Sequence, residues 1–138
     1  MELQEDLIVD IPEDRVRFFG GTGKMLLPCP ATIEAQIMKI PEHSLLTTNL
    51  LCKMLTAQFN VQGTCPITTK SSLRAVAQGT QNNVAYWRVV TKNGGLMSGF
   101  PGGVEEQAAN LRKEGFTVDT SGKTPRVQNF TAHLVHFD

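Results

Sequence analysis

The predicted fold is built outward from residues 83–96, which read Asn-Val-Ala-Tyr-Trp-Arg-Val-Val-Thr-Lys-Asn-Gly-Gly-Leu. The β-branched and aromatic residues from 84 to 90 predict a strand. Asn93-Gly94 supplies the positive φ angles of a tight turn, which sends the chain back through Leu96. A small β-hairpin is therefore expected in this stretch.

A helix is predicted directly after the hairpin. Phe-Pro-Gly-Gly at 100–103 breaks the backbone, and Val-Glu-Glu-Gln-Ala-Ala-Asn-Leu-Arg-Lys-Glu follows at 104–114. One face of this helix is apolar and consists of Val104, Ala108 and Leu111. Gly115 stands just past its end, where a left-handed residue commonly stops a helix.

Three further helices are predicted upstream, each from a capping threonine and an apolar stripe. The first starts at Thr32 and ends at Pro41, the second starts at Thr47-Thr48 and runs to about Gln58, and the third follows Thr68 or Thr69 and covers Lys70 to Gln78. The loop at 60–68 is longer than the connection of a tight helix-turn-helix. The expected fold is a single α/β (α+β) domain of winged-helix type, with three helices, a small β-hairpin wing and a following helix.

Residues 1–31 are interpreted as an N-terminal extension of a domain that spans 32–138 and ends in a C-terminal tail. Short strands are expected in the extension at 7–9 and 16–19, with a turn between them. Gly20-Gly21-Thr22-Gly23-Lys24 is interpreted as a flexible connector. A phosphate-binding Walker loop needs Ser or Thr after its lysine, and Met25 stands there.

The composition is typical of a soluble globular domain, with 41% hydrophobic and 19% charged residues in 138. The formal net charge is zero, so any DNA contact must rest on a local basic patch. Three widely spaced cysteines without a Cys-x-x-Cys pair argue against a disulfide framework or a zinc site and favour a reducing compartment. Without a signal peptide or an apolar run of membrane-spanning length, a cytoplasmic location with no membrane contact is expected.

Four segments of the second half form a pattern: Val84 to Val90, the Gly94-Gly95 turn, Gly102-Gly103, and Leu111 to Gly115. They resemble the C-terminal domain of the alkylguanine-DNA alkyltransferases, the methylated-DNA-protein-cysteine methyltransferase family. That family has Pro-Cys-His-Arg-Val before a similar turn, glycine pair and helix. On this register Tyr86 stands at the acceptor cysteine and Trp87 at its histidine partner. The chain is more similar to alkyltransferase-like proteins, in which another residue, often tryptophan, replaces the cysteine.

The resemblance implies two groups of site residues. The DNA-binding group is Thr47, Thr48, Lys70, Ser71 and Arg74, with Arg74 as the finger that fills the gap left by an extruded base. The base-pocket group is Tyr86, Trp87, Arg88, Phe100, Gly102 and Gly103. An extruded base is held by stacking and by hydrogen bonds to its edge, and aromatic faces suit that task.

Other interpretations of these residues stay open. Strand alternation would place Tyr86 and Trp87 on opposite faces, so one of them would belong to the core. Arg74 could equally be a solvated arginine on an amphipathic helix. Thr48 stands where the family has a tyrosine that helps to rotate the target phosphate. A hydroxyl and helix N-terminal N–H groups still bind phosphate, but the bulky lever is absent.

No catalytic residue, cofactor or metal is expected. A methyl acceptor needs an activated thiolate, and Tyr86 cannot supply one. Cys29 and Cys65 adjoin prolines in predicted loops and are expected to be the exposed cysteines, whereas Cys52 is expected to fill core space. His43, His133 and His136 lack metal-ligand spacing with partners. Glu114 matches the acid that polarises the family's histidine, and without that histidine it is expected to be structural.

The sequence thus predicts a non-catalytic, monomeric protein that binds double-stranded DNA, recognises alkylated or damaged guanine by base flipping, and has repair proteins as further partners. The alternative is a winged-helix protein-interaction or regulatory module without base recognition. Neutral charge, the missing tyrosine and the 60–68 loop favour this alternative. A positive stripe along the Lys70–Arg74 helix would favour DNA, and an apolar patch there would favour a protein partner.

Overall fold

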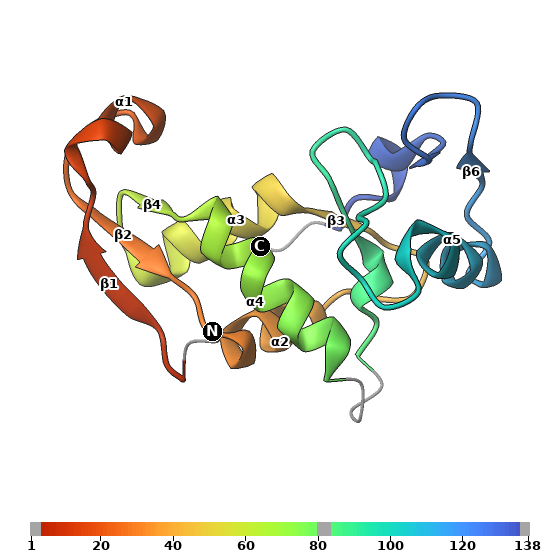
Figure 1. Cartoon of the computed structure of the whole chain (residues 1–138), viewed down its shortest axis with the longest axis horizontal. Coiled ribbons are helices and arrows are strands. Elements are labelled where there is room, and N and C mark those ends of the chain that lie inside the picture. The colour runs from red at the N-terminus through yellow and green to blue at the C-terminus, as the bar shows by residue number, and fades with distance from the viewer. Residues whose placement is uncertain (1–3, 80–83, 136–138) are drawn as a thin grey trace.

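A computed structural model describes residues 4–79 and 84–135 of the chain (Figure 1). In chain order the elements, with η for 3-10 helices, are β1 (Leu7–Asp10), η1 (Glu13–Arg15), α1 (Val16–Phe19), β2 (Lys24–Leu27), α2 (Pro30–Ile37), β3 (Leu46–Thr47), α3 (Thr48–Phe59), β4 (Gly63–Thr64), α4 (Pro66–Gln78), η3 (Tyr86–Arg88), β5 (Val89–Val90), α5 (Gly103–Lys113), β6 (Val118–Asp119), β7 (Arg126–Val127) and η4 (Phe130–His133). The predicted mixed α+β class is confirmed.

Short sheets join segments that are distant in sequence. β1 pairs antiparallel with β2, and β2 pairs in parallel with β4, so the N-terminal extension shares a sheet with the 60–68 region. β3 pairs in parallel with β5, and β6 pairs antiparallel with β7. The C-terminal tail returns to the domain as predicted, because Leu45 N–H donates to His133 O and Val135 N–H donates to Leu45 O.

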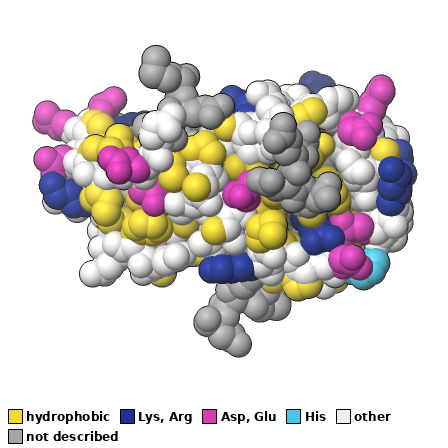
Figure 2. All heavy atoms as spheres, turned by 90° about the horizontal axis from the view of Figure 1, so that it is seen from below, with side chains coloured by type: hydrophobic (Ala, Val, Ile, Leu, Met, Phe, Trp, Pro, Cys, Tyr) yellow, Lys and Arg dark blue, Asp and Glu magenta, His cyan; other side chains and the backbone are white. Residues whose placement is uncertain are grey.

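The helices α3 and α4 occupy the middle of the molecule, with the N-terminal sheet at one end and α5 at the other (Figure 1). One hydrophobic cluster fills the space among α2, α3, α4 and η3, and a second packs beneath α5. Trp87 is half-buried and packs against both clusters. A third, smaller cluster around Ile11, Met25 and Cys65 holds the N-terminal sheet. Hydrophobic side chains also gather on the surface at this end (Figure 2), where β1 exposes Leu7 and Ile8.

The strand predicted at 16–19 is wrong, because these residues form α1. The chain must reverse between the antiparallel β1 and β2, and one helical turn does this within a few residues. Gly20 ends the turn in the left-handed conformation at φ 77°, with its N–H bonded to Arg17 O and Val16 O. Residues 24–27, for which the sequence predicts no helix or strand, form β2.

Two helices begin earlier than predicted. α2 begins at Pro30 rather than after Thr32, and α4 begins at Pro66 rather than after Thr68 or Thr69. A proline at the first helical position loses no hydrogen bond, so these prolines start helices instead of marking a linker. Thr32 has a different role, since its hydroxyl donates to Asp6 at 2.7 Å.

The strand predicted from 84 to 90 is also wrong over most of its length. Residues 86–88 form a 3-10 turn, and only Val89–Val90 pairs as β5, with β3 instead of with the chain after the turn. Leu96 N–H donates to Pro125 O instead, so the expected hairpin is not formed. The Asn93-Gly94 turn itself is present, with Gly94 at φ 80° and its N–H bonded to Thr91 O.

Two helix signals with local causes are confirmed. Thr47 caps α3 by accepting from Leu50 N–H, and α5 ends before Gly115 at φ 96°. Whether the arrangement is a winged helix stays a prediction. Within the described ranges no helix is long and apolar enough to cross a membrane.

Candidate nucleic-acid interface

The solvent face of α4 has a basic stripe. Lys70, Ser71 and Arg74 are exposed, while Leu73 and Ala77 on the opposite face are fully buried. Lys70 and Arg74 are four residues apart and therefore neighbours on the helix surface. Together α3 and α4 contain three basic residues, the third being Lys53, and no acidic residue. The neutral chain thus has a local positive surface over its two central helices.

Arg74 lies against the loop that precedes α5. A Cβ added at Gly99 would come 2.5 Å from Arg74 Nε and 2.8 Å from its Cδ, so the arginine side chain runs directly over this glycine. Two more glycines end the loop in left-handed conformations, Gly102 at φ 77° and Gly103 at φ 69°. Glycine adopts such angles without steric cost, so the glycines give the loop conformations that other residues would resist.

The two threonines at the start of α3 have different roles. Thr47 is 2% exposed, and its hydroxyl accepts from Leu50 N–H at 3.3 Å, so its side chain is engaged in capping and is not available to DNA. Thr48 is half-buried at the first helical position. Of the two predicted backbone contacts, only Thr48 presents part of its surface, beside the N-terminal N–H groups of the helix.

Tyr86 and Phe100 lie together in the interior. Their ring centroids are 4.9 Å apart in an edge-to-face arrangement, and Tyr86 makes a similar contact with Trp87 at 5.4 Å. Tyr86 is 7% exposed and Phe100 3%. Burial, with a smaller contribution from the charge of Glu106, raises the pKa of Tyr86 above its usual value. The rings predicted to line a base pocket are therefore brought together, but they are closed against each other.

Because η3 replaces the expected strand, Tyr86 and Trp87 do not alternate across a sheet. Both rings contact the same interior, and only Trp87 keeps part of its surface in solvent. Gln107, which the sequence analysis did not single out, holds this segment. Its amide donates to Trp87 O at 3.1 Å and Val89 O at 3.0 Å, and its Oε1 accepts from Met97 N–H at 2.7 Å. A glutamine near the middle of a helix gives no sequence signal for such a role.

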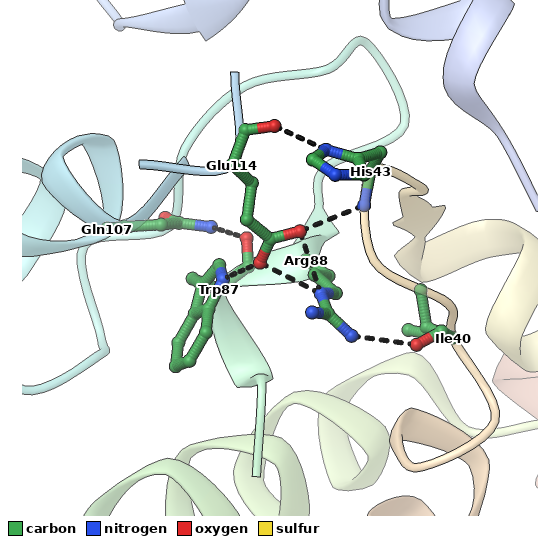
Figure 3. A network of polar contacts seen from close by, with 6 residues as sticks. All are labelled: Ile40, His43, Trp87, Arg88, Gln107 and Glu114. Carbon is green, nitrogen blue, oxygen red and sulfur yellow. Dashed lines mark hydrogen bonds and ion pairs between the residues drawn. The ribbon is translucent and has the colours of Figure 1, made fainter. Parts of the chain in front are cut away.

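Glu114 is the centre of a polar network that we call the Glu114 clamp, formed with His43, Trp87, Arg88 and Ile40 (Figure 3). The Arg88 Nε donates to both carboxylate oxygens at 2.9 and 3.1 Å, and the Trp87 indole N–H donates to Oε2. The Arg88 Nη1 donates to Ile40 O at 2.8 Å. His43 N–H donates to Glu114 Oε1 at 3.0 Å, and the His43 ring contacts Glu114 O.

The contacts of the Glu114 clamp favour the ionised form of the Glu114 carboxyl. Burial by itself raises the pKa of Glu114, but hydrogen bonds from His43 N–H, Trp87 and Arg88, together with the Arg88 charge, outweigh it, and the pKa lies below its usual value. The structural role expected for Glu114 fits this geometry, and Arg88, predicted for the base pocket, is engaged with Glu114 and Ile40 O instead. The clamp fixes Trp87 next to Tyr86 and joins three distant segments of the chain.

The cysteines differ from their prediction. Cys29 and Cys65 are each only 5% exposed, because they cap α2 and α4 and pack beneath neighbouring elements, whereas Cys52 is half-buried on α3. Burial raises the pKa of Cys65, but bonds from Thr68 and Ile67 and the Arg15 charge lower it overall. All three thiols lie outside the Tyr86 segment. Among the described residues there is no cluster of His, Cys, Asp and Glu that could hold a metal ion, and His136 lies outside them.

Comparison with protein-family models, curated proteins and solved structures gave no match.

Proposed function

We propose that the chain is a non-catalytic DNA-binding protein that recognises an alkylated or damaged guanine in duplex DNA. The observation that supports it most is the placement of Arg74, exposed on a helix without acidic residues and in contact with the loop whose Phe100 packs on Tyr86. The finger residue, the loop and the aromatic rings of the resemblance are neighbours in space. In this proposal α4 lies along the groove and Arg74 fills the space of the extruded base.

Base entry in this proposal requires the loop at 97–103 to move, because Tyr86 and Phe100 pack directly together. Gly99, Gly102 and Gly103 provide the freedom for that movement. An opened loop would part Phe100 from Tyr86 and expose both rings for stacking on the base, while the Glu114 clamp holds Trp87 and Arg88 in place. The network supports the pocket from behind and makes no contact with the base itself.

In this proposal the protein binds the alkylated base without transferring the alkyl group, because Tyr86 stands at the acceptor position. Tyr86 has no thiol, and a phenol is protonated and a poor nucleophile at neutral pH even before burial raises its pKa further. The protein would mark the lesion for other repair proteins instead of removing the alkyl group.

The test is the affinity of the full chain for a short fluorescent duplex with and without one O6-alkylated guanine, at two salt concentrations. We expect tighter binding to the lesion duplex, and Arg74→Ala should lose about tenfold, or ~1.4 kcal/mol, of that affinity. Arg112→Ala is the matched control, because it removes an exposed arginine on α5. Equal affinity for both duplexes, or equal effects of both variants, would refute the proposal.

The second candidate is a winged-helix interaction or regulatory module that lacks base recognition. It is favoured by the closed Tyr86–Phe100 contact and by Thr48 in place of the phosphate-rotating tyrosine. Salt-dependent binding that ignores the lesion, with Lys70→Ala and Arg74→Ala weakening both duplexes alike, would select this candidate.

A further inference from the structure

A second surface lies beside the α4 stripe, in a groove between the N-terminal extension and the outer side of α3. The groove has a volume of about 600 Å³. Its walls come from α1, from the exposed side of α3, from β4 and from the start of α4. Side chains that define its shape are Phe18, Cys52, Thr56, Ala57, Val61 and Pro66.

The groove is apolar and has a rigid aromatic rim. Phe18 is 66% exposed, an unusual state for a phenyl ring. Its neighbour Phe19 packs edge-to-face against it at 5.0 Å. Phe19 in turn lies over Gly63, where any added Cβ would overlap its ring. The rim is thus anchored to β4, so the exposed Phe18 is held beside the groove at little entropic cost to a ligand.

The charge that lines the groove is positive, and the flanking η1 and α1 have charges of both signs. Lys53 is the one charged residue among its described lining residues. The Arg15 guanidinium lies 5.7 Å from the centroids of both phenyl rings, and Arg17 is exposed on α1. Glu13 and Asp14 precede α1 in η1 and do not line the groove. An occupant with complementary chemistry would insert apolar side chains and present a carboxylate to Lys53.

We propose that this groove docks an acidic amphipathic segment of a partner protein. Helix-in-groove recognition uses apolar anchors on one face of such a segment. Nucleic acid fits less well, because phosphates gain nothing from the apolar floor formed by Ala57 and Val61. The inference does not depend on lesion recognition. It accounts for the exposure of Phe18, and it places a partner site on α1, α3 and the first turn of α4, next to the DNA stripe.

The test uses the full chain and a fluorescein-labelled amphipathic peptide with leucine and phenylalanine on one helical face and aspartate and glutamate on the other. Its twin has lysine and arginine at the acidic positions. Fluorescence anisotropy should show micromolar binding of the acidic peptide and at least about tenfold weaker binding of the basic twin. Thermal unfolding of every variant confirms that it is folded.

Three variants locate the site. Ala57→Trp fills the groove from an exposed helix position, and Phe18→Ala removes an exposed ring, so both variants should fold. Each should weaken the binding of the acidic peptide at least about fivefold. Lys53→Glu should weaken it further by charge reversal. Lys39→Glu makes the same change at an exposed position outside the groove and should leave binding unchanged.

Equal binding of both peptides, no binding of either, or equal effects of Lys53→Glu and Lys39→Glu would overturn the proposal. An unmodified DNA duplex that displaces the acidic peptide from the native protein, and that no longer binds Ala57→Trp, would identify nucleic acid as the occupant. This result would also overturn the proposal. Lesion-duplex affinity measured on the same variants keeps the two proposals apart, because Ala57→Trp should leave it intact while Arg74→Ala should not change peptide binding.

Discussion

The two ends of the molecule contain the same kind of ion pair in opposite surroundings. At the α5 end, Arg88 and Glu114 have side chains only 13% and 12% exposed, and the carboxylate accepts further bonds from Trp87 and His43. At the N-terminal end, the side chains of Lys24 and Asp10 are 58% and 84% exposed, and among the described contacts these side chains bond only to each other. Water competes for the second pair and not for the first.

The N-terminal extension is therefore not held by its ion pair. It is attached by the β2–β4 pairing and by the hydrogen bonds of Asp6 with Cys29 N–H and Thr32. Apolar packing adds to this, through the cluster of Ile11, Met25 and Cys65 and through Phe19 packed over Gly63. The α5 end instead depends on hydrogen bonds that meet at one buried carboxylate. The same type of contact is essential in one region and dispensable in the other, and four experiments address that contrast.

The largest effect is expected for Glu114→Gln. The substitution keeps the shape but removes the charge, which leaves Arg88 buried without its counter-ion, so the free energy of unfolding should fall by about 2 to 3 kcal/mol. Urea unfolding measures this free energy. Glu105→Gln, at an exposed position of the same helix, is the control. A loss for Glu114→Gln no larger than for the control would show that the clamp does not stabilise the fold.

Gly63→Ala should destabilise the N-terminal end by about 2 kcal/mol, because the new methyl group would overlap the Phe19 ring that anchors α1. Gly122→Ala is the matched control, since its nearest neighbour would be Thr124 O at 4.0 Å. Thermal or urea unfolding measures the stability loss of both variants relative to the native protein. Equal stabilities would mean that α1 moves away without cost and that the apolar attachment is weak.

Acidification should remove part of the stability that Glu114 provides. Its pKa is lower in the folded protein than in the unfolded chain, so the contribution is fully present above the unfolded value of about 4.3 and is lost as the pH falls through the folded pKa. The stability difference between the native protein and Glu114→Gln should be constant near neutral pH and shrink in acid. If the stability difference between the two proteins stays constant at pH values well below the unfolded pKa of Glu (about 4.3), the pKa of Glu114 is not lowered by folding.

Asp10→Ala should have the smallest effect, at most about 0.5 kcal/mol, because both partners of its ion pair are largely solvated. Added salt should erase even this difference. A double-mutant cycle with Lys24→Ala isolates the pair energy. A coupling as large as that between Arg88 and Glu114 would end the contrast between the two regions.

The residues near the candidate site show how far sequence reasoning reaches. The Arg74 helix, the glycines before α5 and the structural role of Glu114 were predictable from residue patterns and from the resemblance. The burial of Thr47, the closed Tyr86–Phe100 contact and the support from Gln107 were not. Each of these depends on the packing of several elements, and no local spacing encodes which side of a residue another element will cover.

The sequence alone determined α3 and α5, because their signals act within a few residues: Thr47 accepts from the N–H three positions on, and Gly115 adopts the left-handed angle that ends a helix. Tertiary structure decided the strands. Val89–Val90 is too short to prefer a partner locally, and it pairs with β3 because burial of Val89, Val90, Leu45 and Leu46 brings the two segments together. It also decided that Phe19 turns inward over Gly63 while Phe18 stays in solvent, since only the position of β4 distinguishes these adjacent rings.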